Sequence, residues 1–350
     1  MVLKNKNCEE KDDIMGNVID QELISFRDEF HKKIIESERI AISGHVRPDG
    51  DCIGSCMAVY NYIQKNFNQD NQKQVDVYLD SIADSFFYLK GSDQYQSSRN
   101  TNIEYDLFIS LDCGSLDRLG MSEAIFSKVK DTINIDHHIS NNGFAKVNYI
   151  KAQASSTCEV LCEVLKEELI DTDVASALYT GIIHDTGVFK HSNTSRRTME
   201  IAGMLLEKGV NNSKIIDESF YQKTYVQNQI LGRCLLESIL VLDGKVIVST
   251  ISRRQMQFYQ ADAYDLDGII DQLRVTKGVE VAVLIHEVDT NEYKVSMRSN
   301  GDVNVSEIAV YFGGGGHVKA AGCTMNGSVH DVINNLTLPI ETQLKNLNII

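Results

Sequence analysis

Through about residue 210, short apolar runs alternate with segments whose apolar residues recur at helical spacing. The runs at residues 39–44, 74–79, 105–111 and 132–135 predict buried strands. Steps of three and four residues predict an amphipathic helix that carries Ile19, Leu23, Phe26, Phe30 and Ile34, and the polar residues 1–16 before it are expected to fray. Further helices are predicted at residues 56–67, 81–89 and 194–209, and others begin near residue 155 and after residue 173. This alternation predicts an α/β fold with a doubly wound, mostly parallel sheet.

The pattern changes after residue 210. Residues 211–238 have a helical pattern without obvious chemistry and are interpreted as a helical connector. Asp243-Gly244 lies between two apolar runs and predicts a hairpin over residues 241–248, followed by strands at 279–285 and 293–298. We therefore expect a first domain at residues 20–210 and a smaller α/β domain at residues 239–350, with a site in the cleft between them.

The stretch from His45 to Ser55 joins a predicted strand to a predicted helix. It places one imidazole and two carboxylates, those of His45, Asp49 and Asp51, on a tight turn whose backbone is restricted by Pro48. Carboxylates so close in sequence repel each other, and a divalent cation is their natural partner. The alternative is an ordinary turn in which an aspartate caps the helix, because Asp, Gly and Pro are common turn residues.

Acids and imidazoles also stand where later strands, and one glycine-bounded segment, are predicted to end. The residues in these positions are Asp112, Asp136, His137, His138 and Asp185. Ligands of such sheets bind beyond the carboxyl ends of the strands, so we expect these side chains to line one pocket with those of the first loop. For the two adjacent histidines, the alternative is one exposed and one structural imidazole.

Four consecutive glycines, Gly313–Gly316, precede His317 and Lys319. In isolation they would be interpreted as a flexible linker. Here they follow an amphipathic segment and precede Ala320-Ala321-Gly322, where glycine amides ahead of a helix start would cradle an anion. Arg298 and Ser299 end the preceding predicted strand, so a phosphate or a carboxylate is the expected ligand.

The composition is that of an ordinary soluble protein, with 43% hydrophobic and 24% charged residues. The net charge of −15 excludes an open basic groove for long nucleic acid, although it does not exclude a small anionic substrate in a local pocket. The eight cysteines are scattered and are interpreted as core residues in a reducing compartment. We find no secretory signal and no membrane-spanning run, and we expect a cytoplasmic protein.

Several imidazoles together with at least four carboxylates suit a pair of divalent cations that share one bridging acid. Mixed nitrogen and oxygen donors favour manganese, cobalt or iron over magnesium, and manganese is our first choice. Paired cations stabilise the attacking and leaving oxygens of an in-line displacement. The expected chemistry is therefore phosphoester hydrolysis without a serine or cysteine nucleophile.

At this point a family resemblance can be stated. The series from His45 to Asp51, then Asp112, the Asp136-His137-His138 triplet, Asp185 and the Gly-Gly-Gly-His run resembles the DHH phosphoesterase superfamily with its DHH-associated C-terminal domain. The likeness covers nearly the whole chain after about residue 20. It is strongest to the branch of bifunctional oligoribonucleases and pAp phosphatases, called nanoRNases. The resemblance implies a catalytic, metal-binding domain at residues 20–210 and a substrate-binding domain at residues 239–350.

The resemblance also implies roles for individual residues. Around one metal ion it places His45, Asp49 and Asp112, and around the other it places Asp51, Asp112, His137 and Asp185. Asp112 would bridge the two ions, His138 would contact the scissile phosphate, and Asp136 would orient the histidines. The substrate would be held by Arg118, Arg298, Ser299, Gly314, Gly315, Gly316 and His317. His184 and His191 do not match this pattern and are interpreted as structural.

The implied substrates are short RNA oligonucleotides, released as mononucleotides, and 3'-phosphoadenosine 5'-phosphate (pAp), converted to AMP. The nearest alternative is a phosphodiesterase that cleaves linear pApA in cyclic di-AMP turnover. A pyrophosphatase shares the metal set but not the glycine run, and a RecJ-type exonuclease would be longer. A nucleotide-sensing protein without turnover is the alternative from another class. The sequence leaves open whether the chain forms a homodimer.

Overall fold

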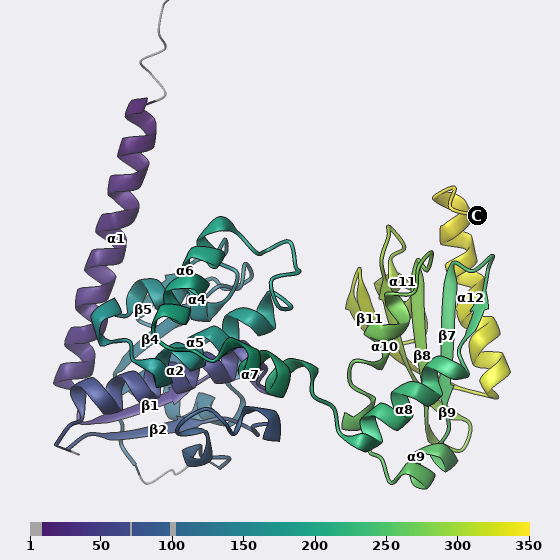
Figure 1. Cartoon of the computed structure of the whole chain (residues 1–350), viewed down its shortest axis with the longest axis horizontal. Coiled ribbons are helices and arrows are strands. Elements are labelled where there is room, and N and C mark those ends of the chain that lie inside the picture. Colours follow the sequence, from purple (N-terminus) through teal and green to yellow (C-terminus); the bar gives the residue numbers. More distant parts are fainter. Residues whose placement is uncertain (1–8, 71, 99–102) are drawn as a thin grey trace, which may run out of the picture. The chain divides into compact units, whose positions relative to one another are not determined.

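The structure, a computed structural model, describes residues 9–70, 72–98 and 103–350 (Figure 1). It contains two compact units, Met1–Gln222 and Lys223–Ile350, whose boundary falls inside the segment predicted as a connector. Among the helices in these described ranges, none is long and apolar enough to cross a membrane.

The first unit is built on a five-stranded parallel sheet. Its strands are β1 (Arg39–Ser43), β2 (Gln74–Tyr78), β3 (Leu107–Leu111), β4 (Asp131–Asp136) and β5 (Val147–Ile150). Their order is β2-β1-β3-β4-β5, and every neighbouring pair is parallel. The prediction of a parallel α/β sheet is confirmed. Strand β5 was not predicted, because a short edge strand of mixed polarity gives little periodic signal.

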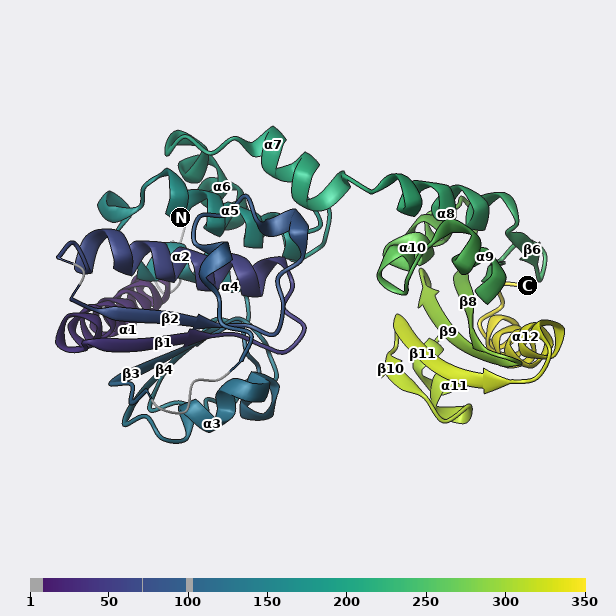
Figure 2. The ribbon, with the colours of Figure 1, turned by 90° about the horizontal axis from the view of Figure 1, so that it is seen from below.

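Helices cover the two faces of this sheet unequally (Figure 2). One face is covered by α1 (Glu9–Glu36), α2 (Gly50–Phe67) and α4 (Thr157–Val164), and α5 (Thr172–Asp185) and α6 (Arg196–Glu207) pack onto these helices. The other face is covered by the 3-10 segment Leu116–Ser122 and by α3 (Glu123–Phe126), around a small cluster that contains Phe108. Helix α7 (Asn212–Ile216) follows α6.

Three local predictions for this unit were wrong. The segment expected to fray reaches into α1, which already begins at Glu9, while residues 1–8 lie outside the described ranges. The helix expected at residues 81–89 is reduced to a 3-10 turn at Asp84–Phe86, whose N-cap, Ala83, has no side chain that could cap a longer helix. Helix α2 begins at Gly50, six residues earlier than predicted, so residues assigned to a loop form its first turns.

The second unit contains a six-stranded mixed sheet of order β10-β11-β9-β8-β7-β6. Its strands are β6 (Ile239–Val241), β7 (Val246–Ile251), β8 (Val281–Asp289), β9 (Glu292–Ser299), β10 (Gly315–His317) and β11 (Ala320–Asn326). Its helices are α8 (Tyr225–Leu236), α9 (Arg253–Tyr259), α10 (Ile269–Arg274), α11 (Val305–Tyr311) and α12 (Val329–Asn346). The hairpin predicted across Asp243-Gly244 is confirmed as the antiparallel pair β6 and β7.

The glycine run does not precede a helix, contrary to expectation. Gly313, with φ of 76°, ends α11, and the amide of Gly314 donates to the carbonyl of Ala309. The remaining glycines enter β10, which pairs with β11, so the segment expected to start a helix is a strand. An anion cradle at a helix N-terminus is therefore not present at this position.

Candidate metal centre

The loop after β1 gives Asp49 two contacts at once. Its Oδ1 accepts hydrogen bonds from the amides of Asp51 and Cys52, both at 3.1 Å, so Asp49 is the N-cap of α2. Its Oδ2 lies 3.6 Å from Nε2 of His45. The Nδ1 of His45 lies 2.9 Å from the carbonyl oxygen of Val46, which leaves Nε2 directed toward the acids. Asp49 can thus cap α2 with one oxygen and still offer its other oxygen to a metal ion, so the two interpretations given as alternatives above are compatible.

Asp112 follows β3 and presents its two oxygens to different imidazoles. Oδ2 lies 3.5 Å from Nε2 of His45, and Oδ1 lies 3.6 Å from Nε2 of His137. The backbone of Asp112 is left-handed, with φ of 51°, a conformation that Asp and Asn adopt more readily than other non-glycine residues. The side chain is 2% exposed. This is the geometry expected of a carboxylate shared by two cations.

The paired histidines after β4 contact different acids. Nε2 of His137 lies 3.1 Å from Oδ2 of Asp185 and 4.0 Å from Oδ2 of Asp51. Nδ1 of His138 lies 2.8 Å from Oδ1 of Asp136, whose side chain is fully buried. The alternative of one exposed and one structural histidine does not describe this arrangement.

Asp51 is held by the N-terminus of a helix distant in sequence. Its carboxylate accepts hydrogen bonds from the α4 amides of Thr157, at 2.6 Å, and Cys158, at 3.0 Å. The positive end of a helix dipole favours a carboxylate at this position. The close approach depends on Gly181 of α5, where a Cβ atom would stand 2.5 Å from Oδ1 of Asp51. A second glycine, Gly54 of α2, faces α5 with equally little room, since its Cβ would stand 2.6 Å from the carbonyl oxygen of Ala177.

Asp185 comes from a helix, whereas the sequence pattern places it at the end of a glycine-bounded segment, just before a turn. It is the last residue of α5, and its carbonyl accepts a hydrogen bond from the Asn193 side chain at 3.2 Å. The neighbouring His184 does not face the acids, because its ring lies between Phe86 and Phe220 and its Nε2 is 3.1 Å from the hydroxyl of Ser219. Burial lowers the pKa of His184 to about 4.

The proximity of the acids determines the charge state of the imidazoles. Burial opposes protonation of His45, but Asp112 and Asp49 outweigh it and raise its pKa to about 11. Burial likewise opposes protonation of His137, and Asp185, Asp51 and Asp112 raise its pKa to about 10. Burial and the charges of Asp112 and Asp185 raise the pKa of Asp51 well above its usual range. The arrangement therefore favours positive charge at its centre.

The clustered residues fit a bound metal ion. Ligating atoms within 4.8 Å of one another occur in overlapping groups that include Asp51, His137 and Asp185, then Asp112 with His137 and His138, and His45 with Asp112. Imidazole nitrogens and carboxylate oxygens suit manganese, iron, cobalt or zinc. Cys52 also lies within this distance of His45 and Asp112, but burial raises the pKa of its thiol well above the usual value. The sequence pattern alone indicates only a core residue at this position.

Two supporting residues were missed in the sequence. The hydroxyl of Thr157 donates to Oδ1 of Asp112 at 3.0 Å, and the Asn141 amide donates to Oδ2 of Asp136 at 2.6 Å. The sequence pattern places Thr157 only at the start of a helix. Asn141 lies three residues after His138, and a polar side chain that close to a histidine pair was a signal available in the sequence.

The predicted substrate-binding residues are distributed over both units. In the first, the carbonyl of Arg118 accepts a hydrogen bond of 2.8 Å from the amide of Val46, so its segment adjoins the His45 loop. In the second, Arg298 and Ser299 are consecutive in β9 and lie on opposite faces of the sheet: Arg298 is partly exposed, while Ser299 is buried. The predicted glycines and His317 lie in or beside β10. A role for these residues in substrate binding stays a prediction.

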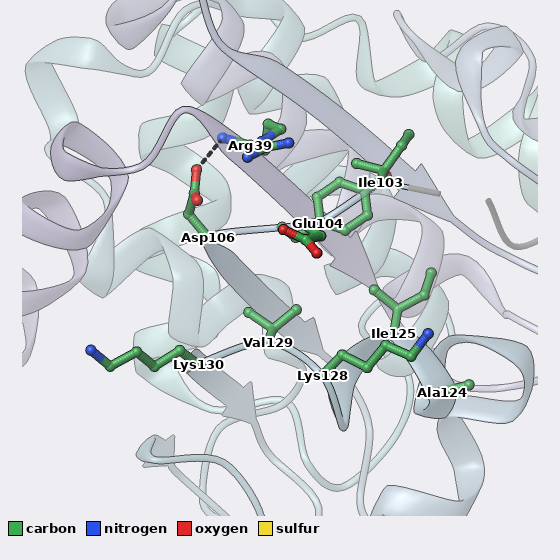
Figure 3. Close-up of a pocket in the computed structure, with 10 residues that line it drawn as sticks. Arg39, Ile103, Glu104, Asp106, Ala124, Ile125, Lys128, Val129 and Lys130 are labelled. Atoms are coloured by element: carbon green, nitrogen blue, oxygen red, sulfur yellow. Dashed lines mark hydrogen bonds between the residues drawn. The ribbon is translucent and has the colours of Figure 1, made fainter. Parts of the chain in front are cut away.

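The first unit also contains a cavity of about 680 Å³ at the opposite edge of its sheet (Figure 3). It is bordered by Arg39, the first residue of β1, by Asp106 just before β3, and by Lys130 just before β4. The amide of Arg39 donates to Oδ2 of Asp106 at 2.8 Å. This cavity lies at the amino ends of the strands, and none of the clustered acids and imidazoles lines it.

The chain matches two family models. Residues 39–182 match the family model described as DHH family, N-terminal domain, and residues 243–345 match the DHHA1 domain. The chain is 27% identical over 317 residues to the Mycoplasma genitalium protein named bifunctional oligoribonuclease and PAP phosphatase NrnA, covering 86% of this chain and 94% of that protein. It is 28% identical over 326 residues to the Bacillus subtilis cyclic-di-AMP phosphodiesterase GdpP, covering 88% of this chain and 48% of that protein.

The fold is shared with a solved structure as well. The crystal structure of an exopolyphosphatase-related protein from Bacteroides fragilis matches with a TM-score of 0.81 at 24% identity, over 92% of this chain and 97% of that one. The two family matches fall on the two units described above, and the first contains every clustered acid and imidazole except Asp185. The chain therefore belongs to the DHH family, with an N-terminal DHH domain followed by a DHHA1 domain.

Proposed function

We propose that the protein is a metal-dependent phosphoesterase that hydrolyses short RNA oligonucleotides to mononucleotides and removes the 3'-phosphate of pAp to give AMP. The observation that carries the proposal is the position of Asp112, whose two oxygens face His45 and His137 separately. The similarity to a relative named for both activities, over 94% of its length, supports the choice of substrates.

The proposed ligands of one divalent cation are His45, Asp49 and Asp112, and those of the other are Asp51, Asp112, His137 and Asp185. When bound, such a pair stabilises charge on the attacking and leaving oxygens and makes a water molecule more acidic. Manganese remains our first choice because the donors are mixed nitrogen and oxygen.

His138 is proposed as the group that contacts the scissile phosphate. Its Nδ1 is held by Asp136, and this hydrogen bond raises the pKa of the imidazole. Asn141 in turn holds the other oxygen of Asp136. His138 is therefore able to offset phosphate charge or to donate a proton to the leaving oxygen from Nε2. That the DHHA1 domain supplies Arg298 and His317 to the same substrate is part of the proposal.

The test is direct. Purified protein with Mn²⁺ is incubated separately with pAp, an RNA of three residues, a long RNA, pApA and pyrophosphate, and the products are separated by chromatography. We expect AMP and phosphate from pAp, mononucleotides from the short RNA, and little product from the long RNA. Hydrolysis of pyrophosphate alone would reject the proposal.

One alternative has a specific observation in its favour. The similarity to a cyclic-di-AMP phosphodiesterase is of the same degree as that to the oligoribonuclease, so linear pApA is a second candidate substrate. A kcat/KM for pApA well above that for RNA dinucleotides of other sequence would favour this assignment. Tight nucleotide binding without turnover would instead indicate a sensor.

A further inference from the structure

The cavity at the amino ends of the first sheet is bordered by three neighbouring strands (Figure 3). The register of β1, β3 and β4 places Arg39, Asp106 and Lys130 in one row across the sheet. The amide of Asp106 donates to the carbonyl of Arg39 at 2.8 Å, which continues the pairing of β1 and β3 up to this row. Neighbouring strands lie about 4.8 Å apart, so the two cationic residues stand roughly 10 Å apart with the acid between them. Their long side chains can therefore reach the same small ligand.

Part of the cavity lining is apolar. It includes Ile125 of α3, Val129 and the ring of Tyr105. The Tyr105 hydroxyl lies 2.7 Å from the hydroxyl of Tyr78 and donates to Oδ2 of Asp76, also at 2.7 Å. Because these partners satisfy its polar atom, Tyr105 offers the cavity ring surface that is fixed in position.

The basic side chains around the cavity have no acidic partners. Arg39, Lys128 and Lys130 all line it, and among the ion pairs of the described residues none within 4.0 Å involves these three. Asp131, the residue after Lys130, is instead paired with Lys33 at 2.9 Å. In a chain of net charge −15, three cations without carboxylate partners at one cavity favour an anionic ligand.

Two carboxylates complete the polar lining. Oδ2 of Asp106 accepts hydrogen bonds from the amides of Glu38 and Arg39, at 3.0 and 2.8 Å. Glu104 is exposed at the cavity. Ionised carboxylates only accept hydrogen bonds, so they suit amino or hydroxyl groups of a ligand. The cavity thus combines cations, apolar surface and hydrogen-bond acceptors.

We propose that this cavity is a second ligand site of the first unit and that it binds a nucleoside monophosphate. Its volume of about 680 Å³ is within the range of about 300 to 1,000 Å³ that is usual for small-molecule pockets. The phosphate contacts Arg39 and the two lysines, the base covers the apolar lining, and amino or ribose hydroxyl groups donate to Glu104 or Asp106. An inorganic anion would leave the apolar surface and both carboxylates without a partner.

This site is separate from the metal centre. Strands β1, β3 and β4 begin at the cavity, and the loops that carry His45, Asp112 and His137 follow their other ends. Five residues at about 3.3 Å each separate the two edges of the sheet by roughly 17 Å. Binding in the cavity therefore does not depend on the proposed hydrolysis.

The test labels the site directly. The full chain in EDTA is photolabelled with 8-azidoadenosine 5'-monophosphate and digested, and the modified residues are assigned by fragment-ion mass spectrometry. We expect adducts within residues 103–106 or 124–130, and an excess of 5'-AMP should suppress them more than the same concentration of inorganic phosphate does. At a subsaturating probe concentration, Arg39→Ala and Lys130→Ala should each reduce the labelling about tenfold, as expected for the loss of a hydrogen bond between charged groups. Lys166→Ala, at an exposed lysine outside the cavity, is the matched control.

A further variant separates this site from the metal centre. Asp112→Asn, which removes the proposed bridging acid, should be labelled in the cavity to the same extent as the wild type. Wild-type protein that is labelled there but hydrolyses no substrate would reject the proposed function and keep the cavity as a nucleotide site. Adducts confined to the metal centre or to the second unit, undiminished labelling in Arg39→Ala and Lys130→Ala, or equal suppression by inorganic phosphate would overturn the proposal.

Discussion

The hydroxyl of Thr157 donates a hydrogen bond of 3.0 Å to Oδ1 of Asp112, the oxygen that faces His137. Thr157 also supplies an amide to Asp51, so a single residue at the start of α4 holds two of the clustered acids. The bond fixes the orientation of a carboxylate whose two oxygens have different neighbours. Partners of metal ligands usually affect affinity as well as position.

Replacement of this hydroxyl is the first prediction. Thr157→Val keeps the side-chain volume and the amide but removes the donor, so Asp112 loses one restraint. We expect the Mn²⁺ concentration that gives half-maximal activity to rise by about 10- to 100-fold. Thr157→Ser keeps a donor and should remain within a few-fold of the wild-type value. An unchanged Mn²⁺ dependence in Thr157→Val would show that the bond does not orient Asp112.

Asp112→Asn should abolish turnover and leave the fold intact. An amide has one oxygen and cannot bridge two cations as a carboxylate can. Asn tolerates the left-handed backbone of this position, so circular dichroism and the thermal midpoint should show a folded protein. Asp117→Asn, an exposed substitution on the same connection, is the control. Wild-type rates in Asp112→Asn would exclude this residue as the bridge.

Metal binding should stabilise the first domain. A ligand present at one hundred times its dissociation constant adds about 2.7 kcal/mol to the free energy of unfolding, provided that it binds only the folded state. Thermal denaturation with Mn²⁺ should therefore occur at a higher temperature than in EDTA, and the shift should reverse on chelation. Asp112→Asn should lose most of this shift. An equal rise in denaturation temperature in the wild type and in Asp112→Asn would show that the cation binds elsewhere.

Arg298→Ala should weaken nucleotide substrates far more than it weakens metal binding. Arg298 lies in the second unit, and every proposed metal ligand lies in the first. We expect a higher KM for pAp with an unchanged Mn²⁺ requirement. Arg254→Ala, at an exposed arginine of the same unit, should change neither quantity. Parallel losses of substrate and metal affinity in Arg298→Ala would contradict separate roles for the two units.

His31 lies outside the metal centre, and its protonation should make the free energy of unfolding depend on pH. Its ring is buried, with Nδ1 2.7 Å from the carbonyl oxygen of Arg27 and Nε2 2.8 Å from the hydroxyl of Tyr62, and burial lowers its pKa. The unfolded chain therefore binds a proton more readily than the folded chain. This contribution to stability is present above about pH 6.5, the unfolded pKa, and is lost as the pH falls below it.

The measurement is urea denaturation at several pH values between 7.5 and 5. His31→Gln should be less stable at neutral pH but should lose less stability on acidification than the wild type. Other histidines are common to both proteins and cancel in the difference. His330→Gln, at an exposed histidine, should follow the wild-type curve. Parallel curves for His31→Gln and the wild type would refute the assignment.

The parallel sheet was predictable because its strands are buried and their apolar runs end abruptly at acids. Asp112 and the residues that follow β4 could be placed at one edge of the sheet for the same reason. The sequence did not show that Asp185 ends a helix, since a short apolar segment before a glycine turn is compatible with either structure. It also could not show which distant amides hold Asp51, because that contact arises only when α4 and α2 pack together.

In the second unit, the structure of the glycine run was harder to predict. Gly313–Gly316 were expected ahead of a helix, but glycine is favourable both where a helix ends and where a strand must approach its neighbour closely. Composition alone does not distinguish these uses. The alternation of Lys294, Ser296 and Arg298 was visible in the sequence, but the small cavity that these residues line depends on the position of α10, which local pattern does not determine.

Gly54 and Gly181 limit how this enzyme can be engineered for heat resistance. Replacing helical glycines by alanine is a common way to raise thermal tolerance. Here an added methyl group at Gly181 would press on Cys158 and on an Asp51 oxygen, and one at Gly54 would force α2 away from α5. Because α2 carries Asp51 and α5 ends at Asp185, either change would displace proposed metal ligands. Substitutions intended to raise thermal stability should therefore begin at exposed positions such as Gly203, where a Cβ atom would meet nothing within 4 Å.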